Sequence, residues 1–270
     1  MATILGTLQS TLTNFPYLRS IWKINTEEER LLGVSLTGVC DCPAIINATE
    51  DQIKELRDYA VEINEEWAHK LNIPASTAIT TIKPSGTVSQ LVNSSSGIHG
   101  RFAKHYIRTV RGDNKDPLTD FMKTSGVPSE PCFMKPDSTT VFSFPIASPQ
   151  GSIMADDLSA IEQLKLWLKL KQNWAEHSVS ITVYVKEDEW LEVGAWVYDN
   201  FDHLTGVSFL PYSEHSYEQA PYQPVSEKEY NAALSEFPSS INWNELSIYE
   251  QEDNTEGAQT LACTAGGCEI

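Results

Sequence analysis

The chain has 270 residues, of which 37 are acidic and 19 basic, so its formal charge at neutral pH is −18. Nonspecific binding to a nucleic-acid polymer or to an anionic membrane depends on clustered lysine and arginine, and this charge balance argues against both. The hydrophobic fraction of 41% suffices for a sizeable core and excludes disorder of the whole chain.

Signals that direct a protein to a membrane or out of the cell are not found in the sequence. No run of about 18 apolar residues occurs, and the segment from Met1 to Gly6 lacks the basic stretch of a secretory signal. Five cysteines are an odd number in a chain of ordinary size, which favours reduced thiols over a secreted disulfide scaffold. We therefore expect a cytoplasmic protein.

Hydrophobic spacing and helix start signals predict alternating helices and strands from the N-terminus onward. Thr49 and Gln52 form a capping box, after which apolar residues recur every three or four positions. The elements predicted in this part of the chain are a helix over Ile4–Leu18, a strand over Leu31–Leu36, a helix from Thr49 to Leu71 and a strand over Ser76–Ile82.

The same alternation continues in the second half of the chain. Asp156 and Asp157 suit the start of a helix because their charges favour its N-terminus. The predicted strands are Thr139–Phe144, Val179–Val185 and Leu204–Leu210, and the predicted helices are Leu158–Trp174, Glu187–Tyr198 and Ser226–Leu234. Five strands that alternate with helices predict an α/β protein with parallel βα units.

The sequence changes character near its end. Beyond Trp243 it becomes polar and acidic, and this composition cannot bury enough surface to order itself. We predict a folded part over residues 1–249 and a flexible tail over residues 250–270, with Cys263 and Cys268 at the tip of the tail.

One candidate binding site is the segment from Lys83 to Gln90, which follows a predicted strand and leads into an apolar stretch. A strand that turns through small hydroxyl residues into a helix presents free N–H groups, which suit a phosphate. The spacing of a Walker loop is absent. An ordinary helix N-cap at Ser85 or Thr87 is the competing interpretation.

The cysteines form the second group of candidates. Cys263 and Cys268 lie five positions apart on a glycine-containing segment, so they can close a disulfide and reopen it by exchange with an external dithiol. The alternative is a pair of unused thiols. Cys40, Cys42 and Cys132 are interpreted as small buried thiols, and no metal site is predicted because no histidine lies near the terminal pair.

Several segments together resemble the adenosylcobalamin-dependent (class II) ribonucleoside-triphosphate reductases. The resemblance runs essentially from end to end of the chain, and the combination of segments is far more specific than any one of them. The matching segments are Ile4–Thr13, Glu28–Gly38, Lys83–Gln90, Ser94–His99, Gly206–Pro211 and the Cys263/Cys268 pair.

The resemblance implies a fold and a set of site residues. The family's fold is a ten-stranded α/β barrel of two five-stranded halves, and this chain looks like the second half followed by a redox tail. By resemblance, Cys263 and Cys268 re-reduce the active site and pass oxidation on to a thioredoxin-like reductant. The residues implied to hold the phosphates of a ribonucleoside triphosphate are Pro84, Ser85, Gly86, Thr87, Val88 and Ser89.

The chain also departs from the family in one respect. The radical cysteine of the family lies in an Asn-x-Cys-x-Glu motif, and neither Cys40, Cys42 nor Cys132 has that setting. The resemblance therefore implies that activity needs the N-terminal half of the same reductase, with which this chain would share the adenosylcobalamin surface. Two other functions fit the residues: a phosphate- or nucleotide-binding module without catalysis, and a thioredoxin-linked dithiol carrier.

Overall fold

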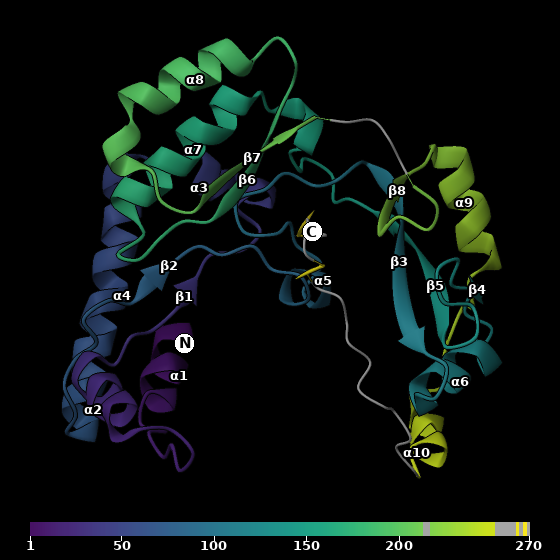
Figure 1. Ribbon diagram of the computed structural model, residues 1–270, viewed down its shortest axis with the longest axis horizontal. Coiled ribbons are helices and arrows are strands. Elements are labelled where there is room, and N and C mark those ends of the chain that lie inside the picture. Colours follow the sequence, from purple (N-terminus) through teal and green to yellow (C-terminus); the bar gives the residue numbers. More distant parts are fainter. Residues whose placement is uncertain (213–216, 252–262, 265–266, 269–270) are drawn as a thin grey trace. The chain divides into compact units, whose positions relative to one another are not determined.

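The computed structural model describes residues 1–212, 217–251, 263–264 and 267–268. The chain divides into two compact units, whose elements are labelled in Figure 1. Unit 1 comprises Met1–Arg101 and Gly151–Tyr212, and unit 2 comprises Phe102–Gln150 and Ser213–Ile270. Each unit therefore joins segments that are distant in the sequence.

Unit 1 is an α/β unit, in agreement with the predicted fold class. Its strands are β1 (Val34–Ser35), β2 (Thr80–Thr81), β6 (Ile181–Val185) and β7 (Val207–Pro211). Its α-helices are α1 (Ala2–Gln9), α2 (Ser20–Glu29), α3 (Pro43–Ile46), α4 (Glu50–Leu71), α5 (Val88–Leu91), α7 (Ala160–Asn173) and α8 (Trp190–Asp199). Short 3-10 helices lie at η1 (Val39–Asp41), η2 (Ala155–Asp157) and η3 (Phe201–His203).

The four strands of unit 1 run parallel. β1 pairs with β2, and β6 pairs with β7 along their full lengths. An isolated parallel bridge between Ile82 and Val179 links the two pairs. Four of the five predicted strands thus lie in the parallel arrangement that their alternation with helices indicated.

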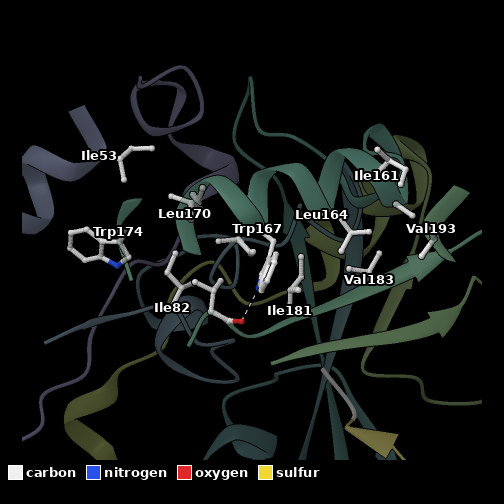
Figure 2. Packing of buried hydrophobic residues seen from close by; sticks show 14 of the residues in the cluster. Ile53, Ile82, Ile161, Leu164, Trp167, Leu170, Trp174, Ile181, Val183 and Val193 are labelled. Carbon is white, nitrogen blue, oxygen red and sulfur yellow. Dashed lines mark hydrogen bonds between the residues drawn. The ribbon is translucent and has the colours of Figure 1, made fainter. Parts of the chain in front are cut away.

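The core of unit 1 forms where helix α7 packs on strand β6. Leu164, Trp167 and Leu170 of α7 are fully buried, and they belong to one hydrophobic cluster with Val179 and Val183. Figure 2 shows side chains of this cluster, among them Val183 of β6. The indole N–H of Trp167 also donates to the Val179 carbonyl at 2.9 Å. Replacing a buried aromatic side chain of this kind by alanine typically costs about 3–5 kcal/mol, so α7 is a main source of stability for the sheet.

Two helices of unit 1 start with capping boxes. α4 begins as predicted, because the Thr49 hydroxyl accepts from the N–H of Gln52 and the Gln52 side chain accepts from the N–H of Thr49. α7 begins later than predicted. Asp156–Asp157 belong to η2, and it is the hydroxyl of Ser159, paired with Glu162, that satisfies the first free N–H groups of α7.

The predicted helix over Ile4–Leu18 was too long. α1 ends at Gln9, where the hydroxyls of Ser10 and Thr11 donate to carbonyls of the preceding turn. Such hydroxyls compete with the helical hydrogen bonds, and Pro16 has no N–H with which to continue a helix. The separate helix α2 was not predicted.

Unit 2 contains an antiparallel sheet with the strand order β4-β5-β3-β8. Its strands are β3 (His105–Asp113), β4 (Ser129–Pro131), β5 (Thr139–Ala147) and β8 (Tyr222–Pro224). Its α-helices are α6 (Pro117–Thr124), α9 (Glu227–Glu236) and α10 (Leu246–Tyr249), and a short 3-10 helix lies at η4 (Trp243–Glu245). The helix predicted over Ser226–Leu234 is confirmed as α9, which carries the Ser226 capping box.

The predicted parallel setting was wrong for the strand over Thr139–Phe144. This strand is β5, and it pairs antiparallel with β3 from end to end. β3 was not predicted, because charged residues and Gly112 interrupt its pattern. A Cβ at Gly112 would collide with Thr119 and Phe142, so this glycine allows close packing of β3 and does not mark a turn.

The end of the chain has two further short strands. β9 (Cys263–Thr264) and β10 (Gly267–Cys268) pair antiparallel, with Cys268 opposite Cys263 in the register. The rest of the predicted tail beyond residue 251 lies outside the described residues, and its flexibility stays a prediction.

Membrane insertion through a helix finds no support in the described part of the chain. α4 is 22 residues long, but charged side chains recur along it. No described helix combines the length and the apolar character needed to cross a bilayer.

Candidate functional site

The predicted phosphate loop, Pro84–Ser89, connects β2 to the four-residue helix α5. The Ser89 N–H donates to Ser85 Oγ at 2.8 Å, and the Ser89 hydroxyl donates to the Ser85 carbonyl at 2.9 Å. Ser96 holds the start of the loop, because its hydroxyl accepts from the Ser85 N–H at 2.7 Å. Ser85 thus caps a backbone N–H of α5, whereas the Thr87 side chain makes no cap hydrogen bond.

Three consecutive N–H groups of the loop are left for a ligand. Within the described residues, the backbone N–H groups of Gly86, Thr87 and Val88 have no acceptor. All three residues are exposed, and no atom lies within 4 Å of the position that a Cβ on Gly86 would occupy. Adjacent N–H groups in a turn suit an anionic oxygen, so the loop provides three donors for a phosphate.

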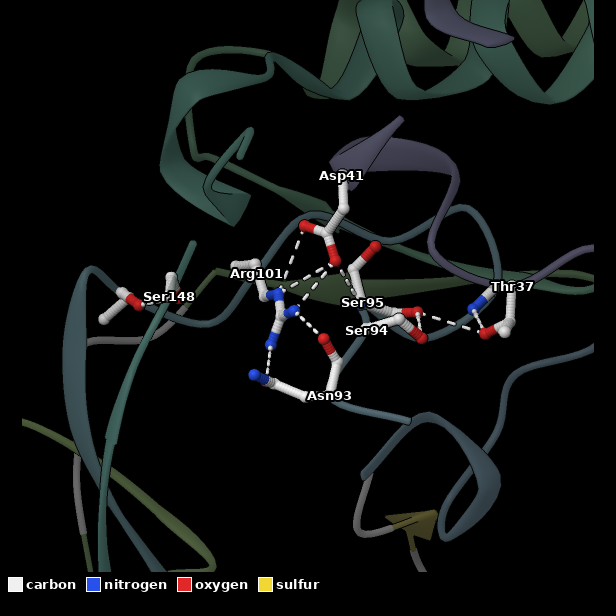
Figure 3. A network of polar contacts seen from close by, with 9 residues as sticks. Thr37, Asp41, Asn93, Ser94, Ser95, Arg101 and Ser148 are labelled. Atoms are coloured by element: carbon white, nitrogen blue, oxygen red, sulfur yellow. Dashed lines mark hydrogen bonds and ion pairs between the residues drawn. The ribbon is translucent and has the colours of Figure 1, made fainter. Parts of the chain in front are cut away.

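A buried ion pair holds the segment that follows the loop (Figure 3). Arg101 Nη2 lies 2.9 Å from the carboxylate of Asp41, and the side chain of Arg101 is only 5% exposed. The same carboxylate accepts from the N–H of Ser95 at 2.6 Å, and the guanidinium also donates to the Asn93 carbonyl at 2.6 Å. The ion pair therefore fixes the segment Asn93–Ser96 against η1. This segment includes Ser96, whose hydroxyl holds the start of the loop.

The ion pair remains charged at neutral pH. Burial by itself would raise the pKa of Asp41, but hydrogen bonds from the Arg101 guanidinium and the Ser95 N–H outweigh it and lower the pKa below its usual value. Because these groups occupy the carboxylate, its role is to position the loop. Asp41 and Arg101 were not predicted as site residues.

His99 is a second anchor of this segment. Its Nε2 accepts from the N–H of Thr182 on β6 at 3.1 Å, so Nδ1 carries the proton and faces the Ser96 carbonyl at 3.0 Å. Burial lowers the pKa of His99, and the bonds to Ser96 and Thr182 offset this only in part. The neutral ring, bonded at both nitrogens, therefore has a structural role.

The prediction of a small buried thiol is confirmed at Cys40. Its Sγ donates to the Ile98 carbonyl at 3.3 Å. Burial, together with the nearby charge of Asp41, raises the pKa of the thiol to about 12, so Cys40 stays protonated and unreactive. The same prediction was wrong for Cys42, which is only partly buried.

Cys132 differs from Cys40 in its electrostatic surroundings. It is buried as well, which would raise its pKa. Hydrogen bonds from the backbone N–H groups of Lys135 and Met134 and from the Arg111 side chain outweigh burial and lower the pKa. The sequence carried no signal for this environment, because Arg111 lies on the strand β3 that was not predicted.

The predicted redox pair lies on the two terminal strands. Cys263 is on β9 and Cys268 on β10, and the backbone register places them opposite one another. Their side chains lie outside the described residues. Among the residues whose side chains are described, no group of three or more His, Cys, Asp or Glu is placed to hold a metal ion.

Comparison with solved structures identifies the class of fold. No protein-family model matches the chain. A crystal structure of a B12-dependent (class II) ribonucleotide reductase matches it with a TM-score of 0.76 and 23% identity, over 94% of this chain and 40% of the other. The chain thus has part of the fold of a ribonucleotide reductase.

Curated relatives define the family more closely. A probable adenosylcobalamin-dependent ribonucleoside-triphosphate reductase of Dictyostelium discoideum is 32% identical over 86% of this chain. Reductases of the same name from Euglena gracilis and Lactobacillus gasseri are 28% and 26% identical over 82% and 96% of it. The chain is therefore homologous over most of its length to the adenosylcobalamin-dependent ribonucleoside-triphosphate reductases, as its sequence segments predicted. It spans 30–39% of the length of these three relatives.

Proposed function

We propose that this chain is the C-terminal part of a reductase that converts ribonucleoside triphosphates to 2'-deoxyribonucleoside triphosphates by thiyl-radical chemistry. The observation that carries the proposal is its similarity to reductases of that name over 82–96% of the chain. In this proposal, residues 1–249 belong to the second half of the ten-stranded catalytic barrel and residues 250–270 form a redox tail. The parallel strands of unit 1 support the barrel assignment.

The loop Pro84–Ser89 holds the phosphates of the substrate in this proposal. Support comes from the N–H groups of the exposed residues Gly86, Thr87 and Val88, which have no acceptor among the described residues. Backbone donors bind an anion without a net positive charge, so the site is compatible with an acidic protein.

The Cys263 and Cys268 pair returns electrons to the active site after each turnover. Its two thiols lose two electrons and two protons and become a disulfide, while the active-site disulfide gains them and becomes two thiols. An external thioredoxin-like dithiol then reverses the change in the tail. The register of β9 and β10 supports this role, because directly opposed positions of antiparallel strands have Cα separations that a disulfide can bridge.

A partner polypeptide supplies the remainder of the enzyme in this proposal. The relatives are about three times as long as the part that matches this chain, and the radical cysteine motif is absent here. Large apolar side chains are also exposed on α1 and α2 and in the segment between them, including Leu5 (62%), Leu12 (73%), Tyr17 (97%) and Trp22 (54%). Apolar surface of this kind is typical of an interaction site. The partner is the N-terminal half of the same reductase, and this chain alone is inactive.

Adenosylcobalamin is the cofactor of the assembled enzyme in this proposal, as in the names of the relatives. When bound, it supplies the radical that starts the reaction. Its cobalt is held within its own corrin ring, so a cluster of protein ligands is not required. We assign no residue of this chain to it.

Reconstitution tests the proposal. We expect deoxyribonucleoside triphosphate to form only when this chain is combined with the polypeptide that carries the remaining part, adenosylcobalamin and a dithiol reductant. Exchanging Cys263 and Cys268 for serine should stop thioredoxin-linked turnover, whereas Cys42→Ser should leave it unchanged. A mixture that binds nucleotide but forms no product would favour a binding module, and unchanged turnover of the double serine variant would disprove the role of the tail.

A further inference from the structure

Lys83 immediately precedes the phosphate loop, and its ammonium group is held in place although the residue is exposed. Lys83 Nζ donates to Ser178 Oγ at 2.6 Å and to Ser180 Oγ at 2.9 Å. Its backbone N–H donates to Ser35 Oγ at 3.1 Å. Ordering a lysine side chain costs rotamer entropy, and here two hydrogen bonds to serine hydroxyls offset that cost.

The positive charge of Lys83 is solvated within the protein but not neutralised. No carboxylate of a described residue lies within 4.0 Å of its ammonium group. An ammonium has three donors, of which the serines use two, and each serine hydroxyl retains its own proton to donate. In a chain of charge −18, the cluster therefore combines one unpaired cation with several free donors, which is the complement of an anionic oxygen.

The two serines lie on the face of the sheet that points away from helix α7. Val179 and Ile181 are buried in the core beneath α7, and neighbouring residues of a strand point to opposite faces. Ser178 and Ser180 therefore lie on the other face. Parallel sheets are normally covered on both faces, and the covering group that matches a lysine and two hydroxyls is a polar, anionic one.

Lys83 adjoins the loop along the chain. Three peptide units separate Lys83 from Gly86, so their Cα atoms lie within about 11 Å of each other. We propose that Lys83, fixed by Ser178 and Ser180, binds an anionic oxygen of a nucleoside polyphosphate whose phosphate chain also meets the N–H groups of the loop. The inference rests on the proposed function, which supplies the nucleotide as ligand.

The test measures binding of inorganic tripolyphosphate to the 270-residue chain by isothermal titration calorimetry. Lys83→Met should weaken binding about 10-fold or more, because a hydrogen bond to a charged group is lost. Lys83→Arg keeps the charge and should retain most of the affinity. The control Lys104→Met removes another exposed lysine, in unit 2, and should have no effect.

The outcomes separate this inference from the proposed function. Equal binding by the wild type and Lys83→Met, or an equal loss in Lys104→Met, would overturn the role of Lys83. Absence of binding by the wild type would overturn both the lysine contact and the loop. Binding that depends on Lys83, without any turnover in the reconstituted mixture, would retain the anion site and reject the reductase. Turnover with an unchanged KM in Lys83→Met would retain the reductase and reject the role of Lys83.

A second measurement applies if Lys83→Met does not fold. The ¹³Cε resonance of Lys83 in the wild-type chain, assigned through its disappearance in Lys83→Arg, should shift when tripolyphosphate is added. Sodium chloride of the same ionic strength should not reproduce the shift. A resonance that does not respond to tripolyphosphate would overturn the inference.

Discussion

Replacing Asp41 by asparagine tests whether the buried ion pair holds the segment behind the phosphate loop. Asp41→Asn leaves the Arg101 guanidinium charged, 5% exposed and without a counter-ion. Removing one partner of a buried pair typically costs about 3–5 kcal/mol. In the wild type the Ser95 N–H donates to the Asp41 carboxylate at 2.6 Å, and the side-chain amide oxygen of the variant can still accept this hydrogen bond. We therefore expect the free energy of unfolding of unit 1 to fall by about 3 kcal/mol, at the lower end of that range.

Urea denaturation followed by tryptophan fluorescence measures this change, because Trp167 and Trp174 are buried in unit 1. The control is Glu66→Gln, which removes the partner of Lys70 in an exposed ion pair on α4 and should cost less than about 1 kcal/mol. A loss for Asp41→Asn as small as that of the control would refute the reasoning.

The same pair predicts how stability depends on pH. The pKa of Asp41 is lower in the folded chain than its usual value, which is about 3.9 in an unfolded chain. The stabilisation is therefore fully present above about pH 4 and is lost as the pH falls through the folded-state pKa. Asp41→Asn should remove this part of the acid denaturation, and an unchanged acid transition would contradict the assignment.

Two further predictions concern neighbouring parts of unit 1. Gly100→Ala should destabilise the chain by about 1–3 kcal/mol, because the new Cβ would lie 2.7 Å from the backbone N of Ala155. Gly194→Ala in α8 should instead stabilise the chain by about 0.5–1 kcal/mol, because the new Cβ meets no atom within 4 Å. Urea denaturation measures both changes, and a change of the opposite sign at either position would contradict the reasoning. The pKa of His99 is lowered by burial, so its contribution to stability is present above the unfolded pKa of about 6.5 and is lost as the pH falls. A nitrogen-15 NMR titration should show a ring that is neutral and protonated at Nδ1 at pH 7. Its midpoint should lie below 6.5, and a midpoint above 6.5 would contradict the assignment.

Local signals predicted much of the secondary structure of this chain. The capping box of Thr49 and Gln52 involves residues three positions apart, so the start of α4 could be read from the sequence. Strand β3 could not be predicted in this way. Glycine is needed at position 112 because Thr119 and Phe142, from a helix and a strand elsewhere in unit 2, leave no room for a Cβ. Since β3 was not predicted, the sequence offered no antiparallel partner for β5.

The same distinction applies to the candidate site. The loop Pro84–Ser89 is one continuous segment, and its hydroxyl residues suggested both a cap and a phosphate site. Lys83 and Ser178 are 95 positions apart, and Asp41 and Arg101 are 60 positions apart. Only folding brings these pairs together, so the residues that hold the loop and the proposed cation beside it carried no local pattern.

The interleaving of the two units has a consequence for synthesis on the ribosome. The first 101 residues contain β1, β2 and the amphipathic helix α4, but the sheet and core of unit 1 also need α7, β6 and β7, which are translated only after residues 102–150. Unit 2 likewise waits for β8. Neither unit can complete its sheet before residue 207. Helix α1 can cover part of α4 early, because Asn64 of α4 donates to the Thr7 hydroxyl. The part of α4 around Ile53, which packs in the cluster of α7, stays uncovered until α7 emerges. Slow completion of this kind favours association with chaperones during translation.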